Sequence, residues 1–458
     1  MLFRFEVSKT NIDQPVLHIP ESASQDLRTF TDETIFIRIG NSQIEARIDA
    51  KTGTHDVYEL LIPPGYPLQL SGCRNFNTRF SKKIRTLFLG PVITVLTDMD
   101  SSGKPMLGRL EQYYDEVCRF ADTHGGLFCL TCPTLLNRQT GYIFNEEKRE
   151  WSKSSIPLPD LLYNRIHSRK SDMDIQVRTI IADLEEKSVF VFNTSYLTKE
   201  YVYELLSQED HFLEYLPHTE IFSFSNLRRL LEFQQDLFIK HIAGSQGKKL
   251  LRLTYLENEY RLIQNLGNES VQNSFSSFNE TAEELAKLKV SSNFIIQETI
   301  DLLKSDERSL DFRFLCHLVD HREWKLISAV ARISGDGQFV SNLAQGGELA
   351  KPLSVLGEFF SPAEALRIYR LMEELAVSVC SRLAENSPLT LGELGVDLGV
   401  DETGKPWLIE VNSKPSKQTY TENNTIRPSV KALYTLSKNT WEERRASYDQ
   451  TGNHDAGT

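Results

Sequence analysis

The segment GVDLGVDETGKPWLIEVNSKPSK, residues 395–417, places acidic residues inside two otherwise apolar runs. The central DETG is a turn sequence, so the two runs are predicted to pair as a β-hairpin. Side chains alternate across a strand. Pairing the apolar faces therefore brings Asp397, Glu410 and Asn412 to one side of the ribbon, where cross-strand neighbours are close enough to share an ion.

Strict alternation on the returning strand also assigns the remaining side chains to faces. Trp407, Ile409 and Val411 are predicted to share the apolar face, whereas Leu408 is predicted to lie beside Glu410.

Two carboxylates and one amide oxygen, without a nearby thiol or imidazole, form a set of hard oxygen donors. Such a set suits Mg²⁺ that is held jointly with substrate phosphates. Gly395 and Gly399 flank Asp397 and leave space for a ligand beside it. The polar outer face of an ordinary surface hairpin explains the same residues without a metal, so the hairpin alone leaves both interpretations open.

A second segment, FIKHIAGSQGKKL at 238–250, ends an apolar strand with Lys240 and continues through Gly244, Ser245 and Gly247. Small residues allow backbone N–H groups to point at phosphate oxygens, and the lysine adds a cation. A plain hairpin turn is the alternative, and the pattern GxxxxGK[ST] of a P-loop is absent. Together with the carboxylate hairpin, this segment predicts phosphoryl chemistry on ATP.

The composition limits the class of protein. With 458 residues, 40% of them hydrophobic, the chain can form two to four domains. A net charge of -12 argues against nucleic acid or an anionic membrane as the main partner. The N-terminal residues do not resemble a secretory signal, and no run approaches the roughly 20 apolar residues of a membrane span. The CLTC at 129–132 is predicted to hold two buried thiols, which fits a reducing, cytoplasmic setting.

The pattern of elements predicts a mixed α+β and α/β multidomain chain. Residues 1–85 read as a strand-rich N-terminal domain, and residues 86–190 read as a small α/β domain with a βαβ signature. Longer elements occupy 191–435, and 436–458 are predicted to be a polar C-terminal tail. Within the third domain, the polar stretch at 265–290 is predicted to be a surface loop or a mobile insertion.

The clearest helix signal is SPAEALRIYRLMEELAVSVCSRLAEN at 361–386, where Ser361 and Glu364 match a capping box around Pro362. Residues 311–333 alternate like two strands joined by a turn.

The order of these motifs resembles the ATP-grasp superfamily, and in particular its YheC/YheD-like, endospore coat-associated branch. The 395–417 hairpin resembles the final motif of that branch, and FNTSYLTKEYVYELL at 192–206 resembles the entry to its domain. FIIQETID at 294–301 resembles the hinge against which adenine stacks. DFRFL at 311–315 and ARISGDGQFVSNLAQGG at 331–347 resemble the segments at the reacting end. The likeness covers roughly 190–420 and implies an ATP-grasp domain of two subdomains, preceded by a small pre-ATP-grasp domain.

The resemblance implies a role for each matching residue. The cofactor-binding residues would be Lys199, Lys240, Gly244, Ser245, Gln246, Gly247, Gln297 and Glu298; the metal ligands Asp397, Glu410 and Asn412; the catalytic residues Arg332 and Arg313; and the substrate contacts Asp311 and Asn342. The chain departs from the family pattern at His241, where a proline is usual, and at Gln345, where peptide-ligase relatives often carry a basic residue. Without the resemblance, Arg332 reads equally well as a salt-bridging strand residue, and Asp311 could simply pair with Arg313.

The chemistry that the resemblance implies is an ATP- and Mg²⁺-dependent ligase. In such an enzyme ATP phosphorylates a carboxylate, and an amine then attacks the acyl phosphate. The expected partners are a small-molecule or peptide carboxylate, an amine and spore-coat proteins, and the expected location is the cytoplasm in association with the endospore coat. A spore-coat scaffold that keeps the fold without turnover is the alternative, and a kinase acting on a small molecule is a third reading.

Overall fold

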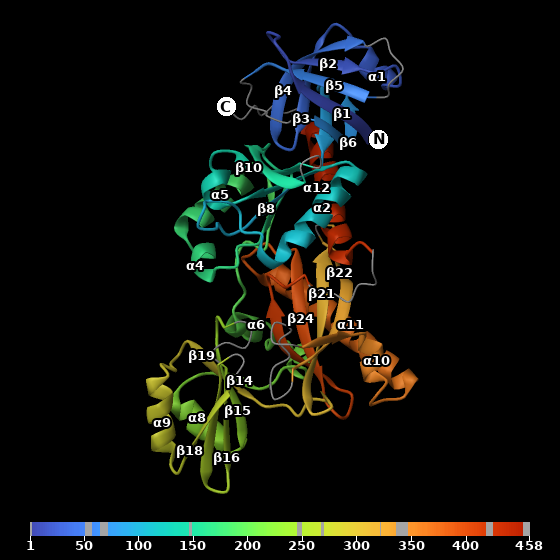
Figure 1. Ribbon diagram of the computed structural model, residues 1–458. Coiled ribbons are helices and arrows are strands. Elements are labelled where there is room, and N and C mark those ends of the chain that lie inside the picture. Colours follow the sequence, from blue (N-terminus) through green and yellow to red (C-terminus); the bar gives the residue numbers. More distant parts are fainter. Residues whose placement is uncertain are drawn as a thin grey trace.

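The computed structural model describes residues 2–50, 57–64, 72–145, 149–244, 250–266, 270–320, 322–335, 347–417 and 425–451. Within these ranges the strands form one closed barrel and three six-stranded sheets, which follow one another along an elongated molecule (Figure 1). The predicted mixture of helices and sheets in several units is confirmed. No helix in the described ranges combines the length and apolar character needed to cross a membrane.

The N-terminal unit is a closed barrel with the strand order β1-β5-β2-β4-β3-β7-β6. Alternating side chains of each strand fill its interior, as in β5, where Tyr58, Leu60 and Ile62 are buried. Its elements are β1 (Leu2–Lys9), β2 (Val16–Ile19), α1 (Gln25–Arg28), β3 (Thr34–Ile39), β4 (Ser42–Ala50), β5 (Val57–Ile62), β6 (Gly72–Ser81) and β7 (Thr86–Gly90).

The barrel extends beyond the boundary expected at residue 85, because β7 closes it between β3 and β6. The apolar run that begins at Thr86 is therefore divided between two sheets, with Pro91 between them. Both strands are buried along their whole length, so the run carries no charged residue that would reveal the change of sheet.

The second unit is a sheet in the order β11-β10-β9-β8-β12-β13. Strands β8, β9, β12 and β13 are parallel, and helix α2 connects β8 to β9 as the βαβ signature predicted. The strands are β8 (Val92–Leu96), β9 (Leu127–Thr131), β10 (Thr140–Asn145), β11 (Glu150–Ser155), β12 (Leu161–Asn164) and β13 (Phe190–Phe192). The helices are η1 (Gly108–Leu110), α2 (Glu111–His124), α3 (Pro133–Leu136), α4 (Arg169–Asp172) and α5 (Ile175–Glu186).

The third unit is an antiparallel sheet, β14-β19-β15-β16-β17-β18, which lies at the lower end of the molecule in Figure 1. Its elements are β14 (Thr219–Ile221), α8 (Phe224–Leu231), β15 (Asp236–His241), β16 (Leu250–Leu256), β17 (Glu259–Asn265), β18 (Ser270–Phe275), α9 (Phe278–Lys287) and β19 (Phe294–Glu298).

The loop predicted at 265–290 was wrong, because β18 and α9 lie there. β18 is an exposed edge strand that pairs with β17, so backbone hydrogen bonds rather than an apolar face hold it in place. Helix α9 buries only Thr281 and Leu285, which is too narrow a stripe to stand out in the sequence.

The fourth unit contains the predicted hairpin, in a sheet of order β23-β22-β21-β24-β25 with β20 beside β21. The strands are β20 (Lys304–Ser305), β21 (Arg308–Leu318), β22 (Trp324–Ile333), β23 (Glu348–Ala350), β24 (Glu393–Val400) and β25 (Pro406–Asn412). The helices are α6 (Lys199–Leu206), α7 (Asp210–Leu213), α10 (Pro352–Leu356) and α11 (Pro362–Asn386). The predicted capping box at Ser361 and Glu364 is confirmed.

Helix α12 (Pro428–Thr451) contradicts the prediction that a polar tail begins at residue 436. The helix packs against the fourth sheet and also against β7 of the barrel (Figure 1). Near its end Trp441 is buried with Ile84 and Phe88 of the barrel. Toward the end of α12 only a narrow stripe of side chains is buried. The polar residues around this stripe therefore dominate the sequence pattern.

Candidate functional site

The predicted hairpin brings the three expected metal ligands together. In the pairing of β24 with β25, Asp397 lies opposite Glu410, and Gly395 lies opposite Asn412. The amide nitrogen of Asn412 donates a hydrogen bond to Oδ2 of Asp397 over 3.1 Å. Two carboxylates and an amide therefore occupy adjacent positions on one ribbon.

A β-bulge in β25 changes the faces that strict alternation predicts. The register shifts between Asp397 and Leu398, so Leu398 lies opposite Leu408 and Ile409 is the extra residue. Leu408 is consequently buried in the apolar core rather than beside Glu410, and the prediction for its face was wrong. The bulge allows Leu408 to enter the core while Glu410 stays with the polar residues.

Asp397 is buried between two guanidinium groups. Arg313, its partner across the β21–β24 pairing, donates from Nε to Oδ1 over 2.7 Å and from Nη2 to Oδ2 over 2.6 Å. Nη2 of Arg332 lies 3.0 Å from Oδ2. Burial pushes the pKa of Asp397 upward, but the two arginines outweigh it and hold the pKa below its ordinary value. The two arginines therefore favour the charged form of Asp397.

Arg332 is also paired with Asp311, with 2.5 Å between Nε and Oδ1. These residues lie opposite each other in the β21–β22 pairing, so Asp311 finds its partner on the neighbouring strand and not in Arg313. Burial lowers the pKa of Arg332, but Asp311 and Asp397 raise it further, so the guanidinium stays charged.

The two predicted phosphate lysines come from different units, and Lys199 contacts the ribbon directly. Thr198 caps the start of α6, and the ammonium of Lys199 lies 2.5 Å from Oε1 of Glu410. Lys240 lies near the end of β15 and donates to Oε1 of Gln297 over 2.5 Å. Burial lowers the pKa of Lys240 to about 8. The nearby charge of Lys199 also lowers this pKa, whereas the charge of Glu410 raises it.

The predicted hinge residues lie at the end of β19, where the chain leaves the third unit for the fourth. Gln297 receives the Lys240 ammonium and donates from Nε2 to Thr219 over 2.9 Å. Glu298 accepts from the backbone N–H of His218 over 2.7 Å and from Gln234 over 2.6 Å. Both side chains thus hold together the strands that meet at the hinge.

The remaining predicted residues are Gly244, Ser245, Gln246, Gly247 and Asn342. Gly244 is described and donates its backbone N–H to the carbonyl of His241 over 2.8 Å. Three members of the predicted phosphate loop, Ser245, Gln246 and Gly247, lie outside the described residues, as does Asn342.

We refer to Lys199, Glu410, Asp397, Arg313 and Arg332 as the ribbon cluster. The donors that it offers to a metal, two carboxylates and the adjacent Asn412 amide, are of the hard-oxygen kind that Mg²⁺ takes. In the described ranges no three His, Cys, Asp or Glu side chains gather as a metal site. At the ribbon the third donor would be the amide of Asn412, which is not one of these residue types. The residues therefore fit Mg²⁺ in their chemistry.

Sequence reasoning missed a second cluster, which joins the loop after β25 to the small α/β unit. Lys414 pairs with Asp172, and Lys417 pairs with Glu393, each as a buried ion pair. Arg165 donates to the hydroxyl of Tyr163 over 3.1 Å and to the carbonyl of Pro415 over 2.9 Å. We refer to Asp172, Lys414, Glu393, Lys417 and Arg165 as the interface cluster. The only signal for it in the sequence was a pair of lysines in SKPSK, directly after the strand that carries Glu410.

Comparison with known proteins shows which family and which relatives the chain resembles. A family model described as YheC/D-like ATP-grasp matches residues 188–438. The chain is 24% identical to the endospore coat-associated protein YheD of Bacillus subtilis (strain 168), over 74% of this chain and 76% of YheD. It is 20% identical to the endospore coat-associated protein YheC of the same organism, over 60% of this chain and 76% of YheC.

Among solved structures, the ATP-grasp ligase PsnB complexed with a minimal precursor is 14% identical, and the match covers 75% of this chain and 98% of that chain with a TM-score of 0.42. The family match confirms the predicted resemblance and the predicted ATP-grasp fold.

Proposed function

This chain belongs to the YheC/D-like ATP-grasp family, and on that premise we propose that it is an ATP- and Mg²⁺-dependent ligase joining a carboxylate to an amine through an acyl phosphate. The observation that carries this proposal is the pairing of Lys199 with Glu410 on the ribbon of Asp397, Glu410 and Asn412, with Lys240 of another unit near enough for the charges of Lys199 and Glu410 to act on it. Cations that face a set of oxygen donors are what phosphoryl transfer requires from a protein.

The two lysines would bind the phosphates of ATP. Lys199 is only partly buried and is held by a single carboxylate, Glu410, so it can exchange that carboxylate for a phosphate oxygen. Lys240 carries a charge that burial disfavours, as its lowered pKa records. A phosphate beside Lys240 would restore the lost solvation of that charge, so part of the binding free energy comes from relief of this penalty.

Asp397, Glu410 and Asn412 would hold Mg²⁺, which would supply positive charge against the negative charge that develops during phosphoryl transfer. The protein's own contribution is to hold the donors in place. Arg313 and Arg332 fix both oxygens of Asp397. Because Arg332 stays charged, it would also stabilise negative charge on the transferring phosphoryl group.

The proposed substrates follow from the family: a small-molecule or peptide carboxylate and an amine. YheD and YheC are described as endospore coat-associated. We extend that association to this chain as part of the proposal, with spore-coat proteins as its partners and the cytoplasm of the sporulating cell as its location.

A second candidate, a coat-associated scaffold without turnover, is favoured by one observation. Each carboxylate of the ribbon is already paired with a protein cation, Glu410 with Lys199 and Asp397 with Arg313 and Arg332. Such pairs could hold the ribbon together in a protein that never binds a metal.

The test is to incubate the protein with ATP, Mg²⁺ and a metabolite extract and to measure ADP release and new amides by mass spectrometry. A ligase releases ADP and forms an amide, whereas a kinase forms a phosphorylated product without one. Glu410→Ala should abolish Mg²⁺-dependent ADP release, while Glu402→Ala, at an exposed position in the same hairpin, should leave it intact. Turnover that survives in Glu410→Ala would refute the metal assignment, and no turnover in the unaltered protein would support the scaffold.

A further inference from the structure

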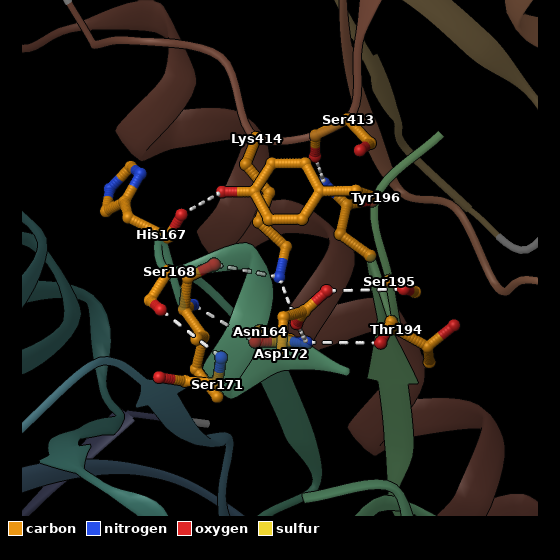
Figure 2. Close-up of polar contacts among 12 residues, drawn as sticks. Asn164, His167, Ser168, Ser171, Asp172, Thr194, Ser195, Tyr196, Ser413 and Lys414 are labelled. Atoms are coloured by element: carbon orange, nitrogen blue, oxygen red, sulfur yellow. Dashed lines mark hydrogen bonds and ion pairs between the residues drawn. The ribbon is translucent and has the colours of Figure 1, made fainter. Parts of the chain in front are cut away.

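The segment that follows Asn412 enters a buried polar network on the small α/β unit (Figure 2). The ammonium of Lys414 lies 2.6 Å from Oδ1 of Asp172 and donates to the carbonyl of Ile166 over 3.1 Å. Neither charged side chain is exposed to solvent. The ring of Tyr196 covers the ammonium, with 4.7 Å between Nζ and the ring centre.

Asp172 joins the ends of several elements of the small α/β unit. It is the last residue of α4. Its Oδ1 accepts from Nδ2 of Asn164, at the end of β12, over 2.9 Å, and its Oδ2 accepts from the hydroxyl of Ser195 over 3.2 Å (Figure 2). The carboxylate therefore has a partner on each oxygen besides the lysine, which is the condition for a stable buried charge.

The same network holds the segment that leads into α6. The side-chain amide of Asn193 donates to the backbone carbonyl of Ser413 over 2.5 Å, and the backbone N–H of Leu197 donates to the hydroxyl of Ser413 over 3.2 Å. Two residues after Leu197 comes Lys199, the partner of Glu410. Lys414 thus belongs to the segment of Asn412 and pairs with Asp172, which also binds Ser195 of the segment that leads to Lys199.

We propose that Lys414 is a positioning residue for the ATP reaction. Its ion pair with Asp172 fixes the segments of Asn412 and Lys199 to one support, so the metal donors and the phosphate lysine keep their separation when MgATP binds. This inference rests on the proposed function, because it assigns Lys414 a task in binding nucleotide and metal together.

Stability alone does not explain the pair. Replacing a buried ion pair by apolar residues of similar volume is often neutral or stabilising, whereas removing one partner is strongly destabilising. A purely structural pair and a positioning pair therefore differ in one respect. If both charges are removed together, a purely structural pair predicts that stability and the geometry of the site recover together. A positioning pair predicts that stability recovers but that the geometry of the site is lost.

The test uses Lys414→Met and the double variant Lys414→Met/Asp172→Leu in the full chain, with Lys431→Met at an exposed position of α12 as the matched control. Chemical denaturation gives stability. Calorimetry with a non-hydrolysable ATP analogue, with and without Mg²⁺, gives the factor by which the metal increases nucleotide affinity. This factor measures the coupling between the two ligands and does not require turnover.

We expect the double variant to be more stable than Lys414→Met, but below the unaltered protein because Asn164 and Ser195 lose an acceptor. It should lose about 10-fold of the metal-dependent gain in affinity, with metal-free affinity nearly unchanged. Lys431→Met should match the unaltered protein in both measurements. Recovery of stability and of the metal-dependent gain together in the double variant would overturn the inference and leave the proposed function standing. An unaltered protein that binds no nucleotide would instead overturn the proposed function.

Discussion

The ribbon cluster and the interface cluster both take residues from the hairpin segment 393–417, but they differ in their access to solvent. In the ribbon cluster the side chains of Lys199 and Glu410 are 17% and 25% exposed. In the interface cluster Lys417 and Glu393 are 2% and 1% exposed, and Lys414 and Asp172 are completely buried. A partly exposed pair can exchange its partner for a ligand, whereas a fully buried pair cannot do so without opening the interface. We therefore propose that the same residue types serve binding in one cluster and positioning in the other.

The largest effect should come from removing one charge of the interface cluster. Glu393→Gln would leave Lys417 buried without its carboxylate, and we expect a loss of about 3–5 kcal/mol in the free energy of unfolding. The matched change in the ribbon cluster, Glu410→Gln, should cost less than about 1 kcal/mol because that pair is partly hydrated. Denaturant titration of both variants measures the contrast, and equal losses would abolish the distinction between the clusters.

A smaller effect is expected on ligand binding at the ribbon. Lys240→Met removes a charge-assisted contact worth about 1.5–3 kcal/mol, so ATP affinity should fall about 10- to 100-fold. Calorimetry measures this change. Lys287→Met, at an exposed position in the same unit, is the control and should bind ATP normally. Unaltered affinity in Lys240→Met would remove Lys240 from the site.

The pH dependence of ATP affinity provides a second test of the role of Lys240. The pKa of Lys240 is lowered to about 8, by burial first and then by Lys199, with Glu410 acting in the opposite direction. Bound phosphate favours the charged lysine, so affinity should be flat below pH 8 and should fall as pH rises above it, by at most about tenfold per pH unit. The Lys240→Met variant should lack this decline. A decline of the same size in that variant would assign it to another group.

The smallest effect should come from a contact outside both clusters. Ser361→Ala removes the hydroxyl that accepts the backbone N–H of Glu364 at the start of α11, and we expect a loss of about 1 kcal/mol. Ser378→Ala, the same change at an exposed position within α11, should not destabilise the protein. Thermal or chemical denaturation compares the two. If Ser361→Ala proved as costly as Glu393→Gln, local capping rather than buried charge would dominate stability here.

The two clusters also differ in how far the sequence predicted them. Asp397, Glu410 and Asn412 follow from alternation on a short hairpin, because strand pairing across a tight turn is local and leaves few registers to choose from. The bulge at Ile409 could not be predicted, since a bulge depends on how the ribbon packs on its neighbours. The interface cluster was missed because its central pair is far apart in the sequence: Lys414 meets Asp172, 242 residues away, only after two units have docked. Lys417 and Glu393 lie 24 residues apart in one unit, but their burial also depends on that docking, since Tyr163 of the small α/β unit contacts Glu393.

The sequence by itself determined the hairpin, the capped helix α11, the βαβ unit and the family, because each of these depends on periodicity or on motifs within a short stretch of chain. The tertiary structure alone decided that β7 closes the barrel, that α12 bridges barrel and sheet, and that Lys414 is buried against Asp172. Burial is the physical reason for the difference. Whether a lysine is a solvated surface residue or a buried ion-pair partner depends on which distant segment covers it, and the local sequence does not specify that segment.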